Sequence, residues 1–225
     1  MHEILETMGN VGVVAVVTVE RARDALPLGK ALLEGGLPLV EVTLRTTAAE
    51  DAIRALADGM PGVRVGAGTV LTTEQAKRAI GAGAKFVVSP GLDPAVVKFC
   101  MDTDVPVIPG CCTPTEILSA LALGLEVVKF FPAATMGGTG TIRMMAGPYP
   151  SVRFVPSGGV NAANLSEYLA LGNVLACGGS WMARSDLIKA GKFAEITRLT
   201  RETMAIASRS RRATGNEDAR MAAQE

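Results

Sequence analysis

The sequence predicts a single-domain (β/α)8 barrel, the TIM barrel, and three observations support this class. Short apolar segments alternate with segments of helical period along the chain, which is the pattern of a parallel α/β fold. Eight such units fit into about 200 residues, the length of a compact barrel. The chain of 225 residues is 48% hydrophobic, which suffices to bury one core, and no internal stretch has the composition of a linker.

The predicted strands are the apolar segments that begin each unit. They lie at residues 11–18, 39–45, 63–70, 85–90, 105–110, 125–131, 152–157 and 173–177. The helix starts support these boundaries. Thr47-Ala-Ala-Glu50 and Thr113-Pro-Thr-Glu116 have the capping-box pattern, and Asp93-Pro94 is a further cap.

Both ends of the chain depart from the repeating units. A short helix near residues 2–8 precedes the first strand, and residues 188–207 form a final helix, so the barrel domain is predicted over 1–207. Residues 208–225 are polar and lack apolar periodicity, so we expect a disordered tail there. Its arginines fit a solvated tail better than a binding patch.

The charge balance favours small-molecule partners. The chain has 22 basic and 22 acidic side chains and a formal net charge of zero, so it has no broad basic face for nucleic acid and no polybasic membrane segment. No apolar stretch reaches the ~18 residues of a membrane span, and the N-terminal segment is acidic, unlike a signal peptide. We therefore expect a cytoplasmic protein.

The cysteines and the single histidine narrow the chemistry. The four cysteines, Cys100, Cys111, Cys112 and Cys177, contain no Cys-x-x-Cys pair, and they fit reduced thiols better than a disulfide frame or a zinc site. Because the one histidine is His2, a histidine-based triad, a histidine general base and a His-rich metal site are all disfavoured. Any acid–base chemistry is therefore expected to use carboxylates, lysines or water, and we expect no cofactor.

Lys129 is the most informative residue, because it is an ammonium within the apolar run Leu125–Pro132. Burial disfavours the charged form of a lysine, and a free amine attacks carbonyls to form a Schiff base. Since side chains alternate along a strand, we expect Lys129 and Phe131 to face the barrel interior and Val128 and Phe130 to face the helices.

The same alternation divides the second strand. Val40, Val42 and Leu44 form the apolar face, so Glu41, Thr43 and Arg45 are predicted to point inward, with Arg45 at the C-terminal end where barrel active sites lie. The alternative for Glu41 and Lys129 is a buried ion pair that only fills the barrel. Barrel interiors are usually filled by branched apolar residues, so an inward Glu, Arg and Lys together favour a site.

The third and fourth strands are expected to contribute to the same mouth. We predict Val65, Ala67 and Thr69 as the inward set of the third strand, with Thr69 offering a hydroxyl at the top. The fourth strand ends in Ser89-Pro90-Gly91, which cannot continue a ladder and turns the chain over the mouth.

Glycine pairs follow the last two strands, in Ser157-Gly-Gly-Val160 and Cys177-Gly-Gly-Ser180. Barrels often bind phosphate at these two loops through backbone N–H groups that glycine leaves unobstructed. One pair alone is also typical of a tight turn, but two at consecutive strand ends favour a phosphate site, to which the hydroxyls of Ser157 and Ser180 can add donors.

With these residues placed, the sequence resembles the class I aldolases that cleave 2-keto-3-deoxy-6-phosphogluconate (KDPG), many of which also cleave 4-hydroxy-2-oxoglutarate (KHG). The resemblance spans roughly residues 10 to 205. The segments that carry it are Glu41–Arg45, Val65–Leu71, Ser89–Gly91, Ile108–Gly110, Val128–Ala133, Ser157–Gly159 and Gly178–Trp181. Departures from the family pattern occur at Ala134, Ser157 and Cys111-Cys112.

The resemblance implies a role for each site residue. Lys129 would be the Schiff-base lysine and Glu41 the general acid/base. Arg45 and Thr69 would bind the pyruvate carboxylate, while Pro90 and Phe131 would shape the pocket. The phosphate would be held by Gly158, Gly159 and Ser180. The family is typically a homotrimer without a metal, and its products would be pyruvate with glyceraldehyde 3-phosphate or with glyoxylate.

Three rival functions stay open at this point. The first is the same chemistry on the galactonate epimer, 2-dehydro-3-deoxy-6-phosphogalactonate, because sequence does not fix stereochemistry at C4. The second is a metal-dependent aldolase. The third, of another class, is a non-catalytic phosphosugar-binding barrel, against which the presence of both Lys129 and Glu41 speaks.

Overall fold

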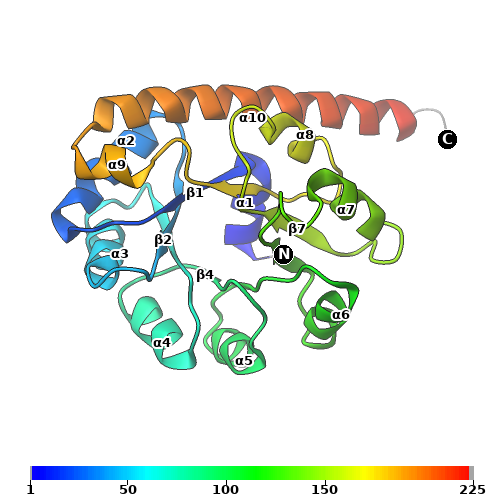
Figure 1. The fold of residues 1–225 in the computed structure, drawn as a ribbon, viewed down its shortest axis with the longest axis horizontal. Helices are drawn as coiled ribbons and strands as arrows, with labels where there is room; N and C mark the ends of the chain where they lie inside the picture. Colours follow the sequence, from blue (N-terminus) through cyan, green and yellow to red (C-terminus); the bar gives the residue numbers. More distant parts are fainter. Residues whose placement is uncertain (1, 223–225) are drawn as a thin grey trace.

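The computed structural model describes residues 2–222, with side-chain surroundings up to Arg211, and these residues form a closed parallel barrel (Figure 1). Within them lie eight strands: β1 (Val13–Val17), β2 (Leu39–Thr43), β3 (Arg64–Gly68), β4 (Val87–Val88), β5 (Val107–Ile108), β6 (Val127–Phe130), β7 (Arg153–Pro156) and β8 (Cys177–Gly179). Six pair in the order β5-β4-β3-β2-β1-β8, and β6 pairs with β7.

Parallel bridges close the two gaps in this ring. Gly110 pairs with Lys129 between β5 and β6, and Ser157 pairs with Gly178 between β7 and β8. Every pairing along the ring is parallel. The predicted (β/α)8 architecture is therefore confirmed.

Helices cover the outside of the ring (Figure 1). They are α2 (Ala25–Glu34), preceded by the 3-10 turn η1 (Ala22–Asp24), α3 (Ala49–Gly59), α4 (Thr73–Gly81), α5 (Pro94–Asp102), α6 (Pro114–Ala122), α7 (Gly138–Met145), α8 (Leu165–Leu169), α9 (Ser185–Lys189) and α10 (Phe193–Ala222). None of the helices in residues 2–222 is both long and apolar enough to cross a bilayer.

The N-terminal helix α1 (Glu3–Val11) closes the base of the barrel. His2 caps it, because its Nδ1 accepts a hydrogen bond from the backbone N–H of Ile4. Met8 is fully buried and lines the barrel interior together with residues of the strands. The predicted short helix at residues 2–8 is thus present, and it leaves the opposite end of the barrel as the open one.

The helix starts were predicted with one error. Asp93 caps α5 and Thr113 forms the full capping box of α6 with Glu116, as expected. Thr47 does not cap α3, which begins after Ala48 without a side-chain cap. A backbone turn, in which Ala49 N–H donates to Thr46 C=O, precedes the helix. The helix therefore begins one residue later than predicted, and Ala48 takes the N-cap position in place of Thr47.

The last strand and the last helix also differ from the prediction. The eighth strand was expected at 173–177, but β8 begins at Cys177, where pairing with Val13 of β1 starts. The prediction of a disordered tail from Ser208 is wrong as far as Ala222, because α10 continues through that residue. The final part of that prediction, residues 223–225, lies outside the described residues.

Arg211 gives a physical reason for the longer helix. Its guanidinium donates a hydrogen bond to the Leu175 carbonyl just before β8, and it lies next to Gly12 at the start of β1. A polar segment without apolar period can therefore stay helical, since one arginine attaches it to the barrel. Burial lowers the pKa of Arg211 from its ordinary value.

The ends of five helices share one hydrogen-bond pattern with a left-handed residue. After α2, α4, α5, α6 and α9, the N–H of the third residue past the helix bonds to the carbonyl five positions back, and the N–H of the second residue bonds to the carbonyl three positions back, as in a Schellman motif. The left-handed residue is Gly36, Gly83, Asp104, Gly124 or Gly191. Asp104, with φ of 55°, is the only side-chain-bearing member of this set.

We predict that Asp104→Gly stabilises the protein. A side chain in the left-handed region adds backbone strain, so the substitution should raise the free energy of unfolding by about 0.5–1 kcal/mol, measured by urea denaturation. The matched change is Gly124→Asp, which places the same side chain at the equivalent residue after α6 and should lower stability by a similar amount. A stability loss in Asp104→Gly would contradict this explanation.

Candidate active site

A buried lysine and a buried glutamate meet inside the barrel. Lys129 Nζ on β6 lies 3.4 Å from Glu41 Oε1 on β2, and the two residues are only 7% and 4% exposed. The contact confirms that both side chains point inward, as the strand alternation predicted. Removing two charges from water is costly, so this pair indicates a site where the protein needs an amine beside a carboxylate.

The backbone around Lys129 is fixed by the neighbouring strand end. Its N–H donates to Pro109 C=O and its C=O accepts from Cys111 N–H, at 2.8 Å each. On the outer face of the barrel, Phe130 packs edge-to-face on Phe154 of β7, with ring centroids 6.1 Å apart. The amine therefore projects from a strand that is hydrogen-bonded to the segment after β5 on one side and to β7 on the other.

The inward face of β3 differs from the prediction. Val65, Ala67 and Thr69 were expected to point inward, but Glu41 pairs with Gly66 and Thr43 with Gly68, so these glycines share the inward face. A Cβ on Gly68 would lie 2.1 Å from Glu41 Oε1, and one on Gly66 would lie 2.3 Å from the Phe86 ring. The carboxylate and the phenyl ring occupy the space that glycine leaves.

The space around the pair is small at depth and wider toward the mouth. A cavity of about 10 Å³ is lined by Glu41, Lys129 and Ser157, with Phe86 and Met8 among the apolar residues around them. Ser157 also lines a second cavity of about 260 Å³ at the C-terminal ends of the strands. Ser157 thus lies between the reactive pair and the open mouth.

Most of the predicted binding residues gather around this mouth cavity. Its lining includes Arg45, Phe131, Gly158, Gly159 and Ser180. Among the described residues, the Arg45 guanidinium has no carboxylate partner, so it is available to an anionic ligand. The Phe131 ring centroid lies 5.2 Å from Lys129 Nζ, within cation–π distance.

The two remaining predicted residues lie beside the mouth rather than in its lining. Thr69 follows β3 in a left-handed conformation with φ of 57° and is half-buried. Pro90 follows β4, and its carbonyl oxygen packs against Gly110, the residue that pairs with Lys129. Both therefore lie at the C-terminal ends of their strands, as the mouth residues do.

The glycine pair after β7 has a left-handed backbone with unused N–H groups. Gly158 and Gly159 both have φ of 88°, and their added Cβ atoms would contact the Phe131 ring and the Ala134 Cβ, respectively. Among the described residues, their backbone N–H groups have no protein acceptor. Two free N–H groups next to the exposed Ser180 hydroxyl fit a phosphate.

Two threonines at the mouth extend the predicted set. Thr18 directly follows β1, and Thr43 ends β2; their Oγ1 atoms are 2.9 Å apart, and both residues line the mouth cavity. Sequence reasoning placed Thr43 inward but did not consider Thr18. The available signal was its position at the C-terminal end of a strand, which all the mouth residues share.

The cysteines near the site are structural. The four cysteines are free, as expected. Burial raises the pKa of Cys111 to about 12, and it also raises the pKa of Cys112, whose Sγ donates to Phe131 C=O. A thiol that stays protonated is a weak nucleophile, so neither competes with Lys129.

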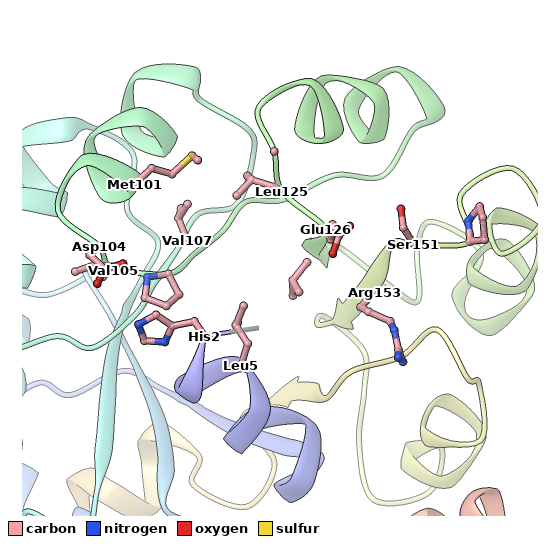
Figure 2. A pocket seen from close by; sticks show the side chains of 14 residues that line it. His2, Leu5, Met101, Asp104, Val105, Val107, Leu125, Glu126, Ser151 and Arg153 are labelled. Atoms are coloured by element: carbon pink, nitrogen blue, oxygen red, sulfur yellow. The ribbon is translucent and has the colours of Figure 1, made fainter. Parts of the chain in front are cut away.

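A cavity larger than the mouth cavity lies at the other end of the barrel (Figure 2). It has a volume of about 670 Å³ and lies between α1 and the strand starts, with His2 and Leu5 on one side and Leu125, Glu126 and Arg153 on the other. Lys129, Arg45 and the glycine pair are absent from its lining. The larger cavity therefore lies apart from the residues that the sequence predicts as the site.

Fold and site together define a (β/α)8-barrel enzyme equipped for covalent chemistry on a carbonyl group next to an anion-binding mouth. A family model described as KDPG and KHG aldolase matches residues 4–199. The chain belongs to this family, whose members are carbon–carbon lyases.

Curated relatives agree with this assignment. A 2-dehydro-3-deoxy-phosphogluconate aldolase of Treponema pallidum is 51% identical over 206 residues, covering 92% of this chain and 98% of the relative. A KHG/KDPG aldolase of Escherichia coli strain K12 is 45% identical, covering 85% of this chain and 90% of the relative.

Solved structures have the same fold. A KDPG aldolase of Legionella pneumophila, with pyruvate captured at low pH as a covalent carbinolamine intermediate, is 37% identical with a TM-score of 0.87, covering 90% of this chain and 98% of that one. A structure described as native KDPGal is 27% identical with a TM-score of 0.76, covering 91% and 96%.

Proposed function

We propose that this protein is a metal-independent class I aldolase that cleaves KDPG (2-dehydro-3-deoxy-6-phosphogluconate) to pyruvate and glyceraldehyde 3-phosphate, in sugar-acid catabolism of the Entner-Doudoroff type. We include cleavage of KHG to pyruvate and glyoxylate. One observation carries the proposal: the buried amine of Lys129, 3.4 Å from the Glu41 carboxylate, lies beneath a mouth lined by free anion-binding groups. The carbinolamine of pyruvate in the Legionella relative supports the covalent route.

Lys129 supplies the nucleophile and then the electron sink. Its free amine attacks the C2 ketone, and loss of water leaves a protonated imine. When the C3–C4 bond breaks, its electron pair moves into this imine and forms an enamine. The enamine then takes a proton at C3, and hydrolysis releases pyruvate and restores the lysine.

Glu41 moves the protons. Breaking the C3–C4 bond requires removal of the C4 hydroxyl proton, and Glu41 is the carboxylate next to the amine. Glu41 also accepts the proton that Lys129 loses before it attacks. The inward glycines of β3 keep room for the carboxylate beside the lysine.

The remaining site residues bind the two ends of the substrate. Arg45 would hold the C1 carboxylate in a two-pronged contact, with Thr69 in the adjacent loop as its partner. The N–H groups of Gly158 and Gly159, with the Ser180 hydroxyl, would hold the phosphate. Pro90 and Phe131 would shape the pocket between these ends.

Identity favours the gluconate substrate over its galactonate epimer. The curated relatives of 45–51% identity are named for KDPG or for both KHG and KDPG, whereas the structure described as KDPGal is only 27% identical. We therefore keep KDPG as the main substrate.

We further propose a cytoplasmic homotrimer. Free cysteines fit a reducing compartment. A matching structure, 25% identical with a TM-score of 0.84 and covering 95% of this chain and 78% of that one, is a porous cage designed by fusing symmetric oligomeric domains. That use of a related barrel supports an oligomer of this chain.

We predict that the purified protein releases pyruvate from KDPG and from KHG and that EDTA leaves both rates unchanged, measured by a coupled pyruvate assay. Lys129→Ala should abolish both activities, because Lys129 is the only buried lysine among the residues whose burial the structure describes. Lys85→Ala, which removes an exposed lysine at the base, is the matched control and should keep full activity.

Two outcomes would contradict this prediction. Loss of activity on chelation, restored by magnesium, would indicate the metal-dependent aldolase. Thermal stabilisation by phosphosugars without turnover of any keto-deoxy acid would indicate the phosphosugar-binding barrel.

A second prediction concerns Glu41→Gln, which keeps the shape of the side chain but cannot take a proton. KDPG cleavage should fall by about 10²–10⁴-fold, the usual contribution of general acid–base catalysis. Glu202→Gln, which removes a surface carboxylate paired with Arg198, should stay within about twofold, since exposed pairs contribute little. If Glu41→Gln cleaved KDPG at the wild-type rate, the proton transfer would have to be assigned to another group.

A further inference from the structure

The hydroxyl pair of Thr18 and Thr43 is a polar feature of the mouth that the proposed mechanism does not use. Thr43 is only 1% exposed, and Thr18 is half-buried. Both line the mouth cavity with Arg45, Ser157 and the glycine pair. Their position between the reactive pair and the phosphate loops raises the question of which substrate group they meet.

Proton counting fixes the direction of the hydrogen bonds. Thr43 Oγ1 lies 3.0 Å from Val17 C=O and 2.9 Å from Thr18 Oγ1. A carbonyl can only accept and a hydroxyl has one proton, so the proton of Thr43 goes to Val17. Thr18 must then donate its own proton to Thr43. Thr18 Oγ1 therefore presents lone pairs, and no proton, to the cavity.

An acceptor in this position selects a particular substrate group. Arg45 and the free N–H groups of Gly158 and Gly159 are donors, which suit carboxylate and phosphate oxygens. Thr18 Oγ1 instead suits a hydroxyl that donates, and its lone pairs disfavour an anionic oxygen.

Strand geometry places Thr18 beside the middle of the substrate. Thr43 lies two residues above Glu41 on the same inward face, a rise of roughly 6.6 Å toward the mouth. If C2 is bonded to Lys129 and the C4 hydroxyl meets Glu41, the next polar group toward the glycine pair is the substituent at C5.

We propose that Thr18, oriented by Thr43, is a specificity-determining residue that accepts a hydrogen bond from the C5 hydroxyl of the phosphorylated six-carbon substrate. This inference rests on the proposed function. KDPG has a hydroxyl at C5, whereas C5 of KHG is a carboxylate, which cannot donate when ionised. The pair therefore favours the sugar acid over the shorter dicarboxylic acid.

The test is the ratio of kcat/KM for KDPG to kcat/KM for KHG in Thr18→Val, which keeps the side-chain shape and removes the hydroxyl. The ratio should fall about tenfold, corresponding to one lost hydrogen bond. Thr18→Ser restores the acceptor and should restore the ratio. The matched control is Thr197→Val on the outer helix α10. This change removes a hydrogen bond from the threonine hydroxyl to Ala31 C=O of α2 and should leave the ratio unchanged.

The outcomes separate this inference from the proposed function. An active wild type whose ratio stays the same in Thr18→Val, or a variant that loses both substrates equally, would overturn the role of Thr18 alone. A folded wild type that cleaves neither substrate would overturn the proposed function and this inference with it.

Discussion

The contact between Lys129 and Glu41 in the barrel interior constrains much of the surrounding structure. Two buried charged groups cost desolvation energy, and removing one partner of such a pair typically costs about 3–5 kcal/mol. The barrel accommodates the pair because β3 has two glycines where side chains would point inward. Phe86 fills the space beside Gly66, and Glu41 fills the space beside Gly68. The glycines needed for packing on β3 are therefore also the residues that leave room for the Lys129–Glu41 contact.

The route from this pair to solvent follows the ends of the strands. Ser157 lines both the small inner cavity and the mouth, and beyond it lie Arg45 and the glycine pair with unused N–H donors. On the other side of the pair, the fully buried Met8 of α1 fills the barrel interior. In the mechanism that we propose, carbonyl chemistry takes place at depth, hydroxyl recognition in the middle and anion binding at the mouth.

Sequence alone was sufficient where a single rule determines the outcome. The alternation of side chains on β2 and β6 correctly brought Glu41 and Lys129 together, and the eight units correctly gave the barrel. The same rule failed on β3, because glycine has no side chain to mark the inward face and the apolar Val65 suits either side. Apolar periodicity failed to predict the end of α10, because Arg211 attaches a polar segment of this helix to the barrel. Thr18 was missed because its meaning depends on a hydrogen bond to Thr43 across two strands.

The most direct test of the central claim is reductive trapping. The protein is incubated with pyruvate and sodium borohydride, digested, and analysed by peptide mass spectrometry. If Lys129 is the buried nucleophile, its peptide gains the mass of a reduced pyruvate adduct and the other lysine peptides do not. Folded protein in which Lys129 stays unmodified, or in which the adduct forms on a surface lysine instead, would contradict the account.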